Sequence, residues 1–123
     1  MPSIFIQISA ISGLLAVALG AFGAHALKNR LDDYAQGIYQ TAVSYHFIHT
    51  LALLACAILL LHWPKSTALT AAAIAFIVGM LLFSGSLYTL SLTGIRGLGA
   101  ITPIGGLAFI IGWGALFLAA YRL

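Results

Sequence analysis

The chain consists of four long apolar segments separated by short polar ones. Its seven charged residues leave four uncharged runs, at residues 1–27, 34–64, 66–95 and 97–121, with lengths of 27, 31, 30 and 25 residues. A helix needs roughly 20 mostly apolar residues to cross the ~30 Å hydrocarbon core of a bilayer. Each run is therefore long enough to span a membrane once and too short to span it twice. We expect transmembrane helices at about residues 4–27, 39–63, 69–92 and 101–121.

Residues at the ends of the apolar runs support these boundaries. Asp32 or Asp33 can cap the second helix, which is expected to begin as early as Asp33 and to end before Pro64. Thr102 is the expected N-cap of the last helix, and Pro103 follows at the first helical position, where its missing N–H costs nothing.

Small residues recur at alternating spacings of four and three in the first and last spans. These stripes are Ser9, Gly13, Ala16, Gly20 and Gly23, and Gly105, Ala108, Gly112, Ala115 and Ala119. In lipid, such stripes allow close helix packing without a hydrophobic driving force. We expect the first and last spans to carry the most complementary packing faces, with Trp113 packing against the first span. Two such faces also predict a homo-oligomer.

Four spans joined by short loops predict an all-α, integral membrane four-helix bundle with up-down-up-down topology and both termini on the same side. Residues 1–123 form one domain. We name the end with both termini side A and the opposite end side B. Lys65 and Arg122 belong to side A, and Lys28, Arg30 and Arg96 to side B. Because the positive residues divide two against three, the positive-inside rule assigns no orientation.

Composition narrows the class of protein further. Only 6% of the residues are charged, 63% are hydrophobic and the net charge is +3, which excludes a soluble domain and a nucleic-acid-binding surface. The single cysteine, Cys56, excludes an intramolecular disulfide and a CxxC site, and we expect it to be a small buried apolar residue. The first run lacks a basic N-terminal segment and is longer than a signal-peptide core, so we interpret it as a permanent span.

Polar side chains within the spans gather toward side B. Because each polar group at membrane depth needs a partner or a water-filled cavity, we predict a polar vestibule between the helices that opens toward side B. The candidate residues are His25, Tyr45, His46, His49, Ser84, Ser86, Tyr88, Arg96 and Thr102.

The histidines allow three interpretations. They can form a hydrogen-bonded network that fixes helix register. They can bind a metal or haem, with His25 opposite His46 or His49. They can also belong to a proton or substrate pathway that includes Arg96. The chain contains no Glu and no Asp inside a span, which excludes a hard-cation site and a pair of catalytic carboxylates.

Four ordered motifs carry a family resemblance. They are Gly20-Ala21-Phe22-Gly23-Ala24-His25; Thr41-Ala42 with Tyr45 and His49-Thr50-Leu51-Ala52; Phe83-Ser84-Gly85-Ser86-Leu87-Tyr88; and Thr102-Pro103-Ile104-Gly105-Gly106 with Gly112-Trp113. The chain resembles the YgdD/YwdK-type small membrane proteins, the family filed as domain of unknown function 423 and related to eukaryotic transmembrane protein 256. The resemblance implies a multi-pass protein of the bacterial inner membrane with no established enzymatic activity. The family motif includes His25, Tyr45 and His49 and leaves position 46 open.

These observations favour a membrane protein that is not an enzyme and has no cofactor or metal. The leading hypothesis is membrane or envelope maintenance, or binding of a lipid or protein partner. The expected partners are membrane lipids, a second copy of the chain or another membrane protein, and no nucleic acid. The alternatives are a small-ligand or proton-handling site in the His/Tyr vestibule, and haem or metal binding through His25 and His49.

Overall fold

The computed structural model describes residues 2–123 and contains only helical elements in that part of the chain. The helices are α1 (Pro2–His25), α2 (Asp33–His62), α3 (Thr67–Gly79), α4 (Gly85–Thr93) and α5 (Thr102–Arg122). A π-helical turn, η1 (Met80–Ser84), joins α3 to α4, and a short 3-10 turn, η2 (Arg96–Ala100), precedes α5.

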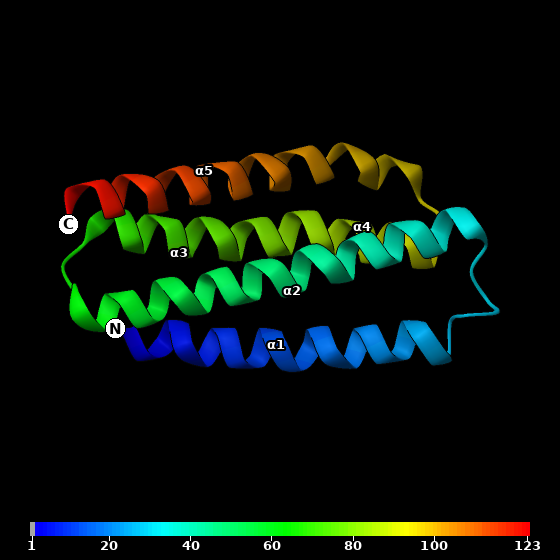
Figure 1. Ribbon diagram of the computed structural model, residues 1–123. Helices are drawn as coiled ribbons and strands as arrows, with labels where there is room; N and C mark the ends of the chain where they lie inside the picture. The colour runs from blue at the N-terminus through cyan, green and yellow to red at the C-terminus, as the bar shows by residue number, and fades with distance from the viewer. Residues whose placement is uncertain (1) are drawn as a thin grey trace.

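Among the described residues, four stretches of helix are long and apolar enough to cross a membrane: Ser3–His25, Asp33–His62, Thr67–Thr93 and Arg96–Arg122. The third combines α3, η1 and α4 into one continuous span. This confirms the predicted all-α fold with four membrane-spanning helices. In Figure 1, α1 begins at the end of the bundle where α5 finishes, and successive spans run in opposite directions.

One predicted helix cap is confirmed and one is wrong. Asp32 is the N-cap of α2, and its carboxylate accepts a hydrogen bond from the Ala35 N–H at 2.8 Å. Thr102 is the first residue of α5 instead of its cap, and its hydroxyl bonds the Ser86 hydroxyl of α4 at 2.7 Å. The Thr102 hydroxyl, which was expected to cap the backbone of the last helix, therefore forms an interhelical hydrogen bond instead. Pro103 lies in the first turn of α5, as predicted.

The spans pack in an order that differs from the prediction. α2 and the α3–α4 span form the centre of the bundle, with α1 on one side and α5 on the other (Figure 1). Trp113 of α5 consequently packs against His49 of α2 and Phe76 of α3, so its predicted contact with the first span is wrong.

Aromatic rings explain this order, because they fill the gaps that the glycines leave. A Cβ atom at Gly112 of α5 would lie 2.6 Å from the Phe76 ring of α3. A Cβ atom at Gly23 of α1 would lie 2.2 Å from the Tyr39 ring of α2. The small-residue stripes are packing faces, as expected, but each packs against a central span instead of meeting the other stripe.

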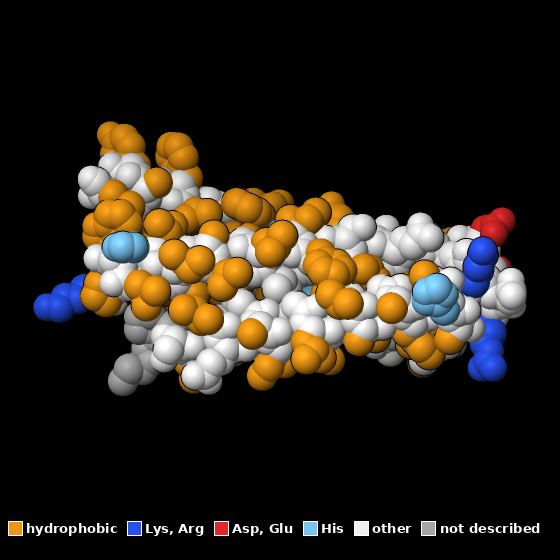
Figure 2. All heavy atoms as spheres, turned by 60° about the horizontal axis from the view of Figure 1, so that its bottom comes forward, with side chains coloured by type: hydrophobic (Ala, Val, Ile, Leu, Met, Phe, Trp, Pro, Cys, Tyr) orange, Lys and Arg blue, Asp and Glu red, His pale blue; other side chains and the backbone are white. Residues whose placement is uncertain are grey.

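The core lies between α2, α3, η1 and α5 and includes the fully buried Leu53, Cys56 and Phe76, with Phe109 3% exposed. Cys56 is a free cysteine in this apolar cluster, in agreement with its structural interpretation. Apolar side chains cover the length of the bundle in Figure 2, and the charged side chains visible there lie at its two ends. This distribution is what a bilayer-spanning surface requires.

Candidate functional site at the middle of the bundle

A hydrogen-bonded cluster of polar side chains connects three of the four spans. His46 of α2 bonds the Ser12 hydroxyl of α1 through Nε2 and the Tyr88 hydroxyl of α4 through Nδ1, both at 2.9 Å. The hydroxyls of Ser12 and Thr50 lie 2.6 Å apart. Each also contacts the Met80 sulfur, at 3.6 Å and 3.5 Å respectively. We call these five residues the His46 cluster.

The His46 cluster lies near the middle of the bilayer-spanning length. The midpoints of the three contributing spans fall at residue 14, between residues 47 and 48, and at residue 80. Ser12, His46 and Met80 each lie within two residues of these midpoints. Polar groups at this depth are costly unless they are bonded to one another. The cluster satisfies this requirement through its mutual contacts.

The π turn brings Met80 and Tyr88 to the same face of their span. In a regular α-helix, two residues eight positions apart point about 80° away from each other. A π turn accommodates about one extra residue, which reduces this difference to about 20°. η1 therefore allows Met80 and Tyr88 to reach the same cluster. Single π turns inside α-helices often occur at functional sites.

The neighbouring helices fit closely around η1. Ser84, which is 1% exposed, donates a hydrogen bond to the Ala42 carbonyl of α2 at 3.0 Å. On the α5 side, a Cβ atom at Gly105 would lie 2.3 Å from the Phe83 backbone nitrogen. The irregular turn is thus fixed by direct contacts with both α2 and α5.

A groove of about 350 Å³ lies over the His46 cluster, between α1 on one side and η1 and α4 on the other. Apolar residues form its rim, where Ile11 is 61% exposed and Leu81 70% exposed. The groove therefore opens sideways toward the surrounding lipid, not toward side B. The lining residues are Ile8, Ile11, Ser12, Leu15, Leu19, His46, Ile77, Met80, Leu81, Ser84, Gly85 and Tyr88.

His49 belongs to a second cluster on the α5 side of the bundle. Its Nε2 accepts a hydrogen bond from the Trp113 indole N–H at 3.1 Å. Its Nδ1 is then the protonated nitrogen, and it donates to the Tyr45 carbonyl at 2.9 Å. The imidazole stacks on the Phe109 ring, with centroids 3.5 Å apart and an interplanar angle of 12°. Both ring nitrogens are occupied, which leaves neither free to ligate a metal.

The nine residues predicted to line one vestibule lie in separate places, so the structure contradicts a single cavity that opens toward side B. His46, Ser84 and Tyr88 line the groove. Tyr45 and His49 face α5 and line an aromatic depression there. The remaining four residues lie outside both places. Ser86 and Thr102 bond each other between α4 and α5, and Arg96 and His25 are exposed.

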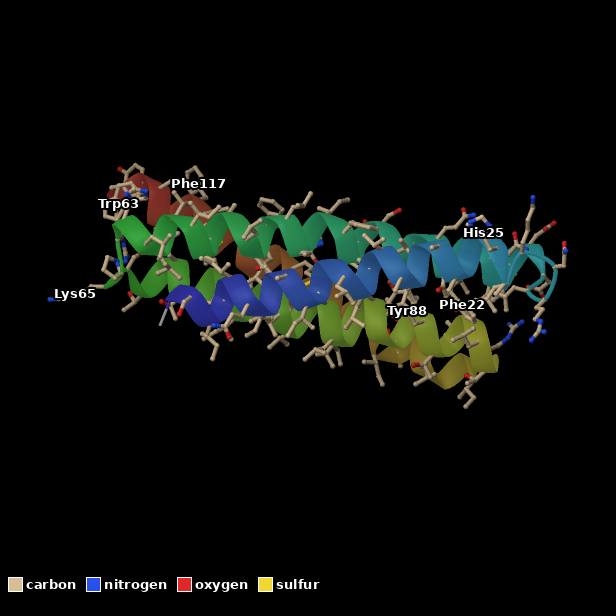
Figure 3. All side chains as sticks on the ribbon, turned by 90° about the horizontal axis from the view of Figure 1, so that it is seen from below. Phe22, His25, Trp63, Lys65, Tyr88 and Phe117 are labelled. Carbon is tan, nitrogen blue, oxygen red and sulfur yellow. The ribbon has the colours of Figure 1, made fainter. Side chains whose placement is uncertain are left out.

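Arg96 and His25 are both exposed near side B. The Arg96 guanidinium lies 5.7 Å from the centre of the Tyr34 ring, a cation–π contact between η2 and the start of α2. His25 is the last residue of α1, and Figure 3 shows it at the end of the bundle opposite Trp63 and Lys65.

The structure therefore contradicts a haem or metal site formed by His25 and His49. His49 faces α5, whereas His25 ends the helix on the other side of the central pair. Within residues 2–123, no group of three or more His, Cys, Asp or Glu side chains is placed to hold a metal ion.

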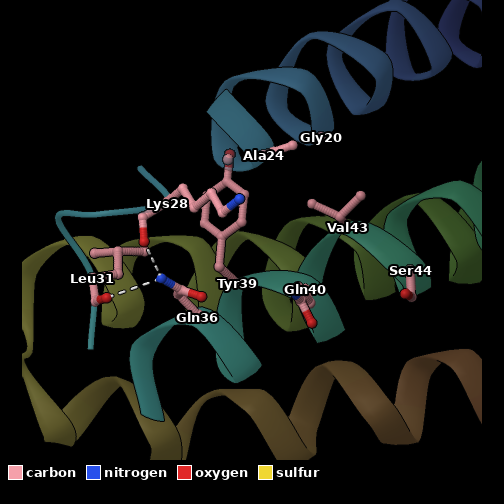
Figure 4. A pocket seen from close by; sticks show the side chains of 10 residues that line it. Gly20, Ala24, Lys28, Leu31, Gln36, Tyr39, Gln40, Val43 and Ser44 are labelled. Atoms are coloured by element: carbon pink, nitrogen blue, oxygen red, sulfur yellow. Dashed lines mark hydrogen bonds between the residues drawn. The ribbon is translucent and has the colours of Figure 1, made fainter. Parts of the chain in front are cut away.

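A further pocket, of about 460 Å³, lies at side B between the end of α1 and the start of α2 (Figure 4). The polar side chains that line it are those of Lys28, Gln36, Tyr39, Gln40 and Ser44. The Gln36 amide donates to the carbonyls of Leu31, at 3.0 Å, and of Lys28, which fixes the loop between the helices. None of the nine predicted residues lines this pocket.

The site prediction missed three members of the His46 cluster. Ser12 and Thr50 were visible as hydroxyl residues inside apolar runs. The sequence did not indicate that Met80 belongs to a polar cluster, since a methionine in an apolar run is ordinarily a core residue. Its role depends on the π turn.

Comparison with known proteins identifies the family. Residues 19–106 match the family model described as "Protein of unknown function (DUF423)". The chain belongs to this family. Among its DUF423 relatives are the UPF0382 membrane protein YwdK of Bacillus subtilis, 46% identical over 97% of both chains, and the UPF0382 inner membrane protein YgdD of Escherichia coli, 38% identical over 100% of this chain and 94% of that one. No solved structure matches the chain.

These relatives confirm the family resemblance seen in the four motifs. A UPF0382 membrane protein of Staphylococcus epidermidis is also 44% identical over 97% of this chain and 96% of its own length. Together with the four spanning helices, the names of the relatives support the expected location in the cell membrane. This DUF423 protein is an integral membrane protein of an uncharacterised family.

Proposed function

We propose that this DUF423 protein is a non-catalytic membrane protein that binds a membrane lipid in the groove between α1 and η1. The observation that carries the proposal is the shape and chemistry of the groove. Exposed apolar side chains form its rim, and the His46 cluster forms its floor near the middle of the spans. A lipid chain is the ligand that this apolar rim fits, and it reaches the groove laterally from the bilayer.

The bonding of the floor supports a binding role over catalysis. His46 bonds neighbours through both ring nitrogens, and Ser84 donates to a backbone carbonyl. No buried side-chain nitrogen or oxygen among the described residues lacks a hydrogen-bond partner. A histidine base in a catalytic triad is oriented by a buried carboxylate, and the residues of 2–123 that line the groove include no Asp or Glu. A role in membrane or envelope maintenance would follow from lipid binding.

Proton handling receives less support from the same cluster. Tyr88, His46, Ser12 and Thr50 form a chain of hydrogen bonds, as a proton pathway requires. The chain ends at the Met80 sulfur, which accepts a hydrogen bond but carries no proton to pass on. Because this short series of hydrogen bonds ends at a thioether, it favours a fixed structural role for the floor of the groove over proton transfer.

Filling the groove tests the proposed function. Gly85 lines the groove, and a Cβ atom there meets only the Met80 carbonyl oxygen, at 4.0 Å. Gly85→Leu therefore places apolar volume in the groove without an immediate clash. Gly114→Leu is the matched control, because a Cβ atom at Gly114 of α5 meets nothing within 4 Å and this residue does not line the groove.

The measurement is native mass spectrometry of protein purified in mild detergent. We expect the wild type and Gly114→Leu to retain a bound lipid that Gly85→Leu loses, with all three proteins equally helical. Retention by Gly85→Leu, or the absence of retained lipid from the wild type, would contradict lipid binding in this groove.

A further inference from the structure

We infer that the groove prefers a lipid alcohol, a long apolar molecule whose polar group is an uncharged hydroxyl that donates a hydrogen bond to the Tyr88 oxygen. This inference rests on the proposed lipid-binding function and specifies the chemical class of the ligand. It follows from counting the protons available to the His46 cluster.

The count begins with the four contacts around Ser12 and Thr50. Ser12 contacts His46, Thr50 and the Met80 sulfur, and Thr50 contacts the same sulfur. The two hydroxyls supply one proton each, and the sulfur supplies none. If the neutral His46 ring carries its proton on Nδ1, two protons serve four contacts. If the proton is on Nε2, the ring donates to Ser12 and three of the four contacts are filled. The Nε2–H form is therefore favoured, because more of these buried contacts become hydrogen bonds.

This tautomer sets the direction of the bond to Tyr88. With the proton on Nε2, His46 Nδ1 is an acceptor, so the Tyr88 hydroxyl donates to it across 2.9 Å. The single Tyr88 proton is thereby used, and its oxygen keeps lone pairs that can only accept. Tyr88 is half-buried and lines the groove. The floor of the groove thus offers the ligand an acceptor.

Depth and charge restrict the ligand further. Tyr88 lies eight residues from the midpoint of its span, about 12 Å along the helix axis, and its side chain leans back toward that midpoint. Its hydroxyl consequently lies within the ~15 Å half-thickness of the hydrocarbon core. The residues of 2–123 that line the groove include no Lys, Arg, Asp or Glu. A charged headgroup would find no counter-ion there, whereas a neutral hydroxyl needs only the acceptor that Tyr88 provides.

Two probes of matched length test the preference. Hexadecanol carries a donor hydroxyl, and hexadecyl methyl ether replaces its proton with a methyl group. We expect the wild type in detergent to bind hexadecanol roughly three- to tenfold more tightly than the ether, the range expected for one hydrogen bond in a membrane interior. The double variant Tyr88→Phe/His46→Phe should bind both probes with equal affinity, because it removes the Tyr88 oxygen and also the His46 Nδ1 acceptor that Tyr88→Phe alone would free in the groove.

The outcomes separate this inference from the proposed function. Equal binding of both probes by the wild type, with both lost in Gly85→Leu, would overturn the alcohol preference and leave lipid binding intact. Binding of neither probe would overturn both. A preference that persists in Tyr88→Phe/His46→Phe would also contradict the inference, because the acceptor would then lie outside the His46 cluster.

The tautomer provides a readout that does not depend on any ligand. Nitrogen-15 NMR of histidine-labelled protein distinguishes a ring protonated on Nε2 from one protonated on Nδ1. We expect His46 to show Nε2–H, with His49 as an internal reference of the opposite form because it accepts from Trp113 through Nε2. The label also reports the exposed His25 and His62, so His46→Gln and His49→Gln are each needed to assign the signal that disappears. An Nδ1–H signal for His46 would overturn the inference.

Discussion

His46 and His49 lie one turn apart on α2 but bond helices on opposite sides of the bundle. His46 reaches Ser12 of α1, and His49 reaches Trp113 of α5. Residues three positions apart diverge by about 60° around a helix, and this divergence suffices because α1 and α5 lie on either side of the central pair. The two imidazoles therefore belong to separate networks, each of which ties one outer helix to α2.

Removing the indole donor should weaken the attachment of α5. Trp113→Phe leaves His49 Nε2 without its partner, and we expect the free energy of unfolding to fall by about 0.6–1.7 kcal/mol, the range for a single interhelical bond in a membrane protein. Reversible unfolding in mixed micelles measures this loss. Trp63→Phe is the control, since Trp63 is 42% exposed at side A. Equal losses from the two substitutions would show that the His49 bond contributes nothing specific.

Close backbone contact makes Gly105 intolerant of any side chain. A Cβ atom there would lie 2.3 Å from the Phe83 nitrogen and 2.7 Å from the Phe83 Cα, and backbone cannot rotate away as a side chain can. We expect Gly105→Ala to lower the free energy of unfolding by about 1–3 kcal/mol through overpacking. At Gly106 the nearest atom outside the local helix would be 3.8 Å away, so Gly106→Ala should cost much less. Thermal unfolding in detergent compares the two, and a Gly106→Ala loss as large would contradict a contact specific to Gly105.

The sequence sufficed to predict the spans but not their neighbours. Hydropathy and the placement of seven charges located four helices, since crossing a bilayer sets both length and composition. Which helices touch depends on how side-chain shapes fit. Gly112 receives the Phe76 ring and Gly23 the Tyr39 ring, and a glycine stripe does not reveal whether it will face a ring or another stripe. Homo-oligomer formation, predicted from the same stripes, stays a prediction that crosslinking in native membranes can test.

The candidate site was predictable in its residue types but not in its grouping. His46, His49 and Tyr88 were identified because polar side chains inside a span need partners. Their division into two clusters depends on α1 and α5 lying on opposite sides of α2. Met80 shares a face with Tyr88 only because η1 contains an extra residue in its turn. A π turn leaves no periodic signal in an apolar run, so this part of the site required the structure.

The fit of the Tyr39 ring against Gly23 predicts a coupled pair. Gly23→Ala would bring a methyl group within 2.2 Å of the ring and displace Tyr39, whose hydroxyl bonds the Leu19 carbonyl. We expect a loss of about 1–3 kcal/mol in the free energy of unfolding. In a Tyr39→Ala background the ring is absent, and Gly23→Ala should then cost little. A double-mutant cycle measures this coupling, and additive losses would contradict a direct contact.

Two serines one turn apart on α1 provide a matched test of the His46 cluster. Ser12 bonds His46 and Thr50 of α2, whereas Ser9, although buried, donates to the Phe5 carbonyl of its own helix at 2.8 Å. Ser12→Ala removes interhelical bonds and leaves the His46 Nε2–H and the Thr50 hydroxyl short of partners. We expect it to lower the free energy of unfolding by about 1–3 kcal/mol.

Ser9→Ala should change the same free energy by only a few tenths of a kcal/mol, since a bond from a serine to its own helix adds little stability. Both variants remove one hydroxyl at a buried position, so the loss of polar burial is similar in each, and the difference between them reports the interhelical bonds. Unfolding in mixed micelles measures both. If the two losses were equal, the His46 cluster would not attach α1 to α2, and the floor of the groove would lack the rigidity on which the lipid-alcohol preference depends.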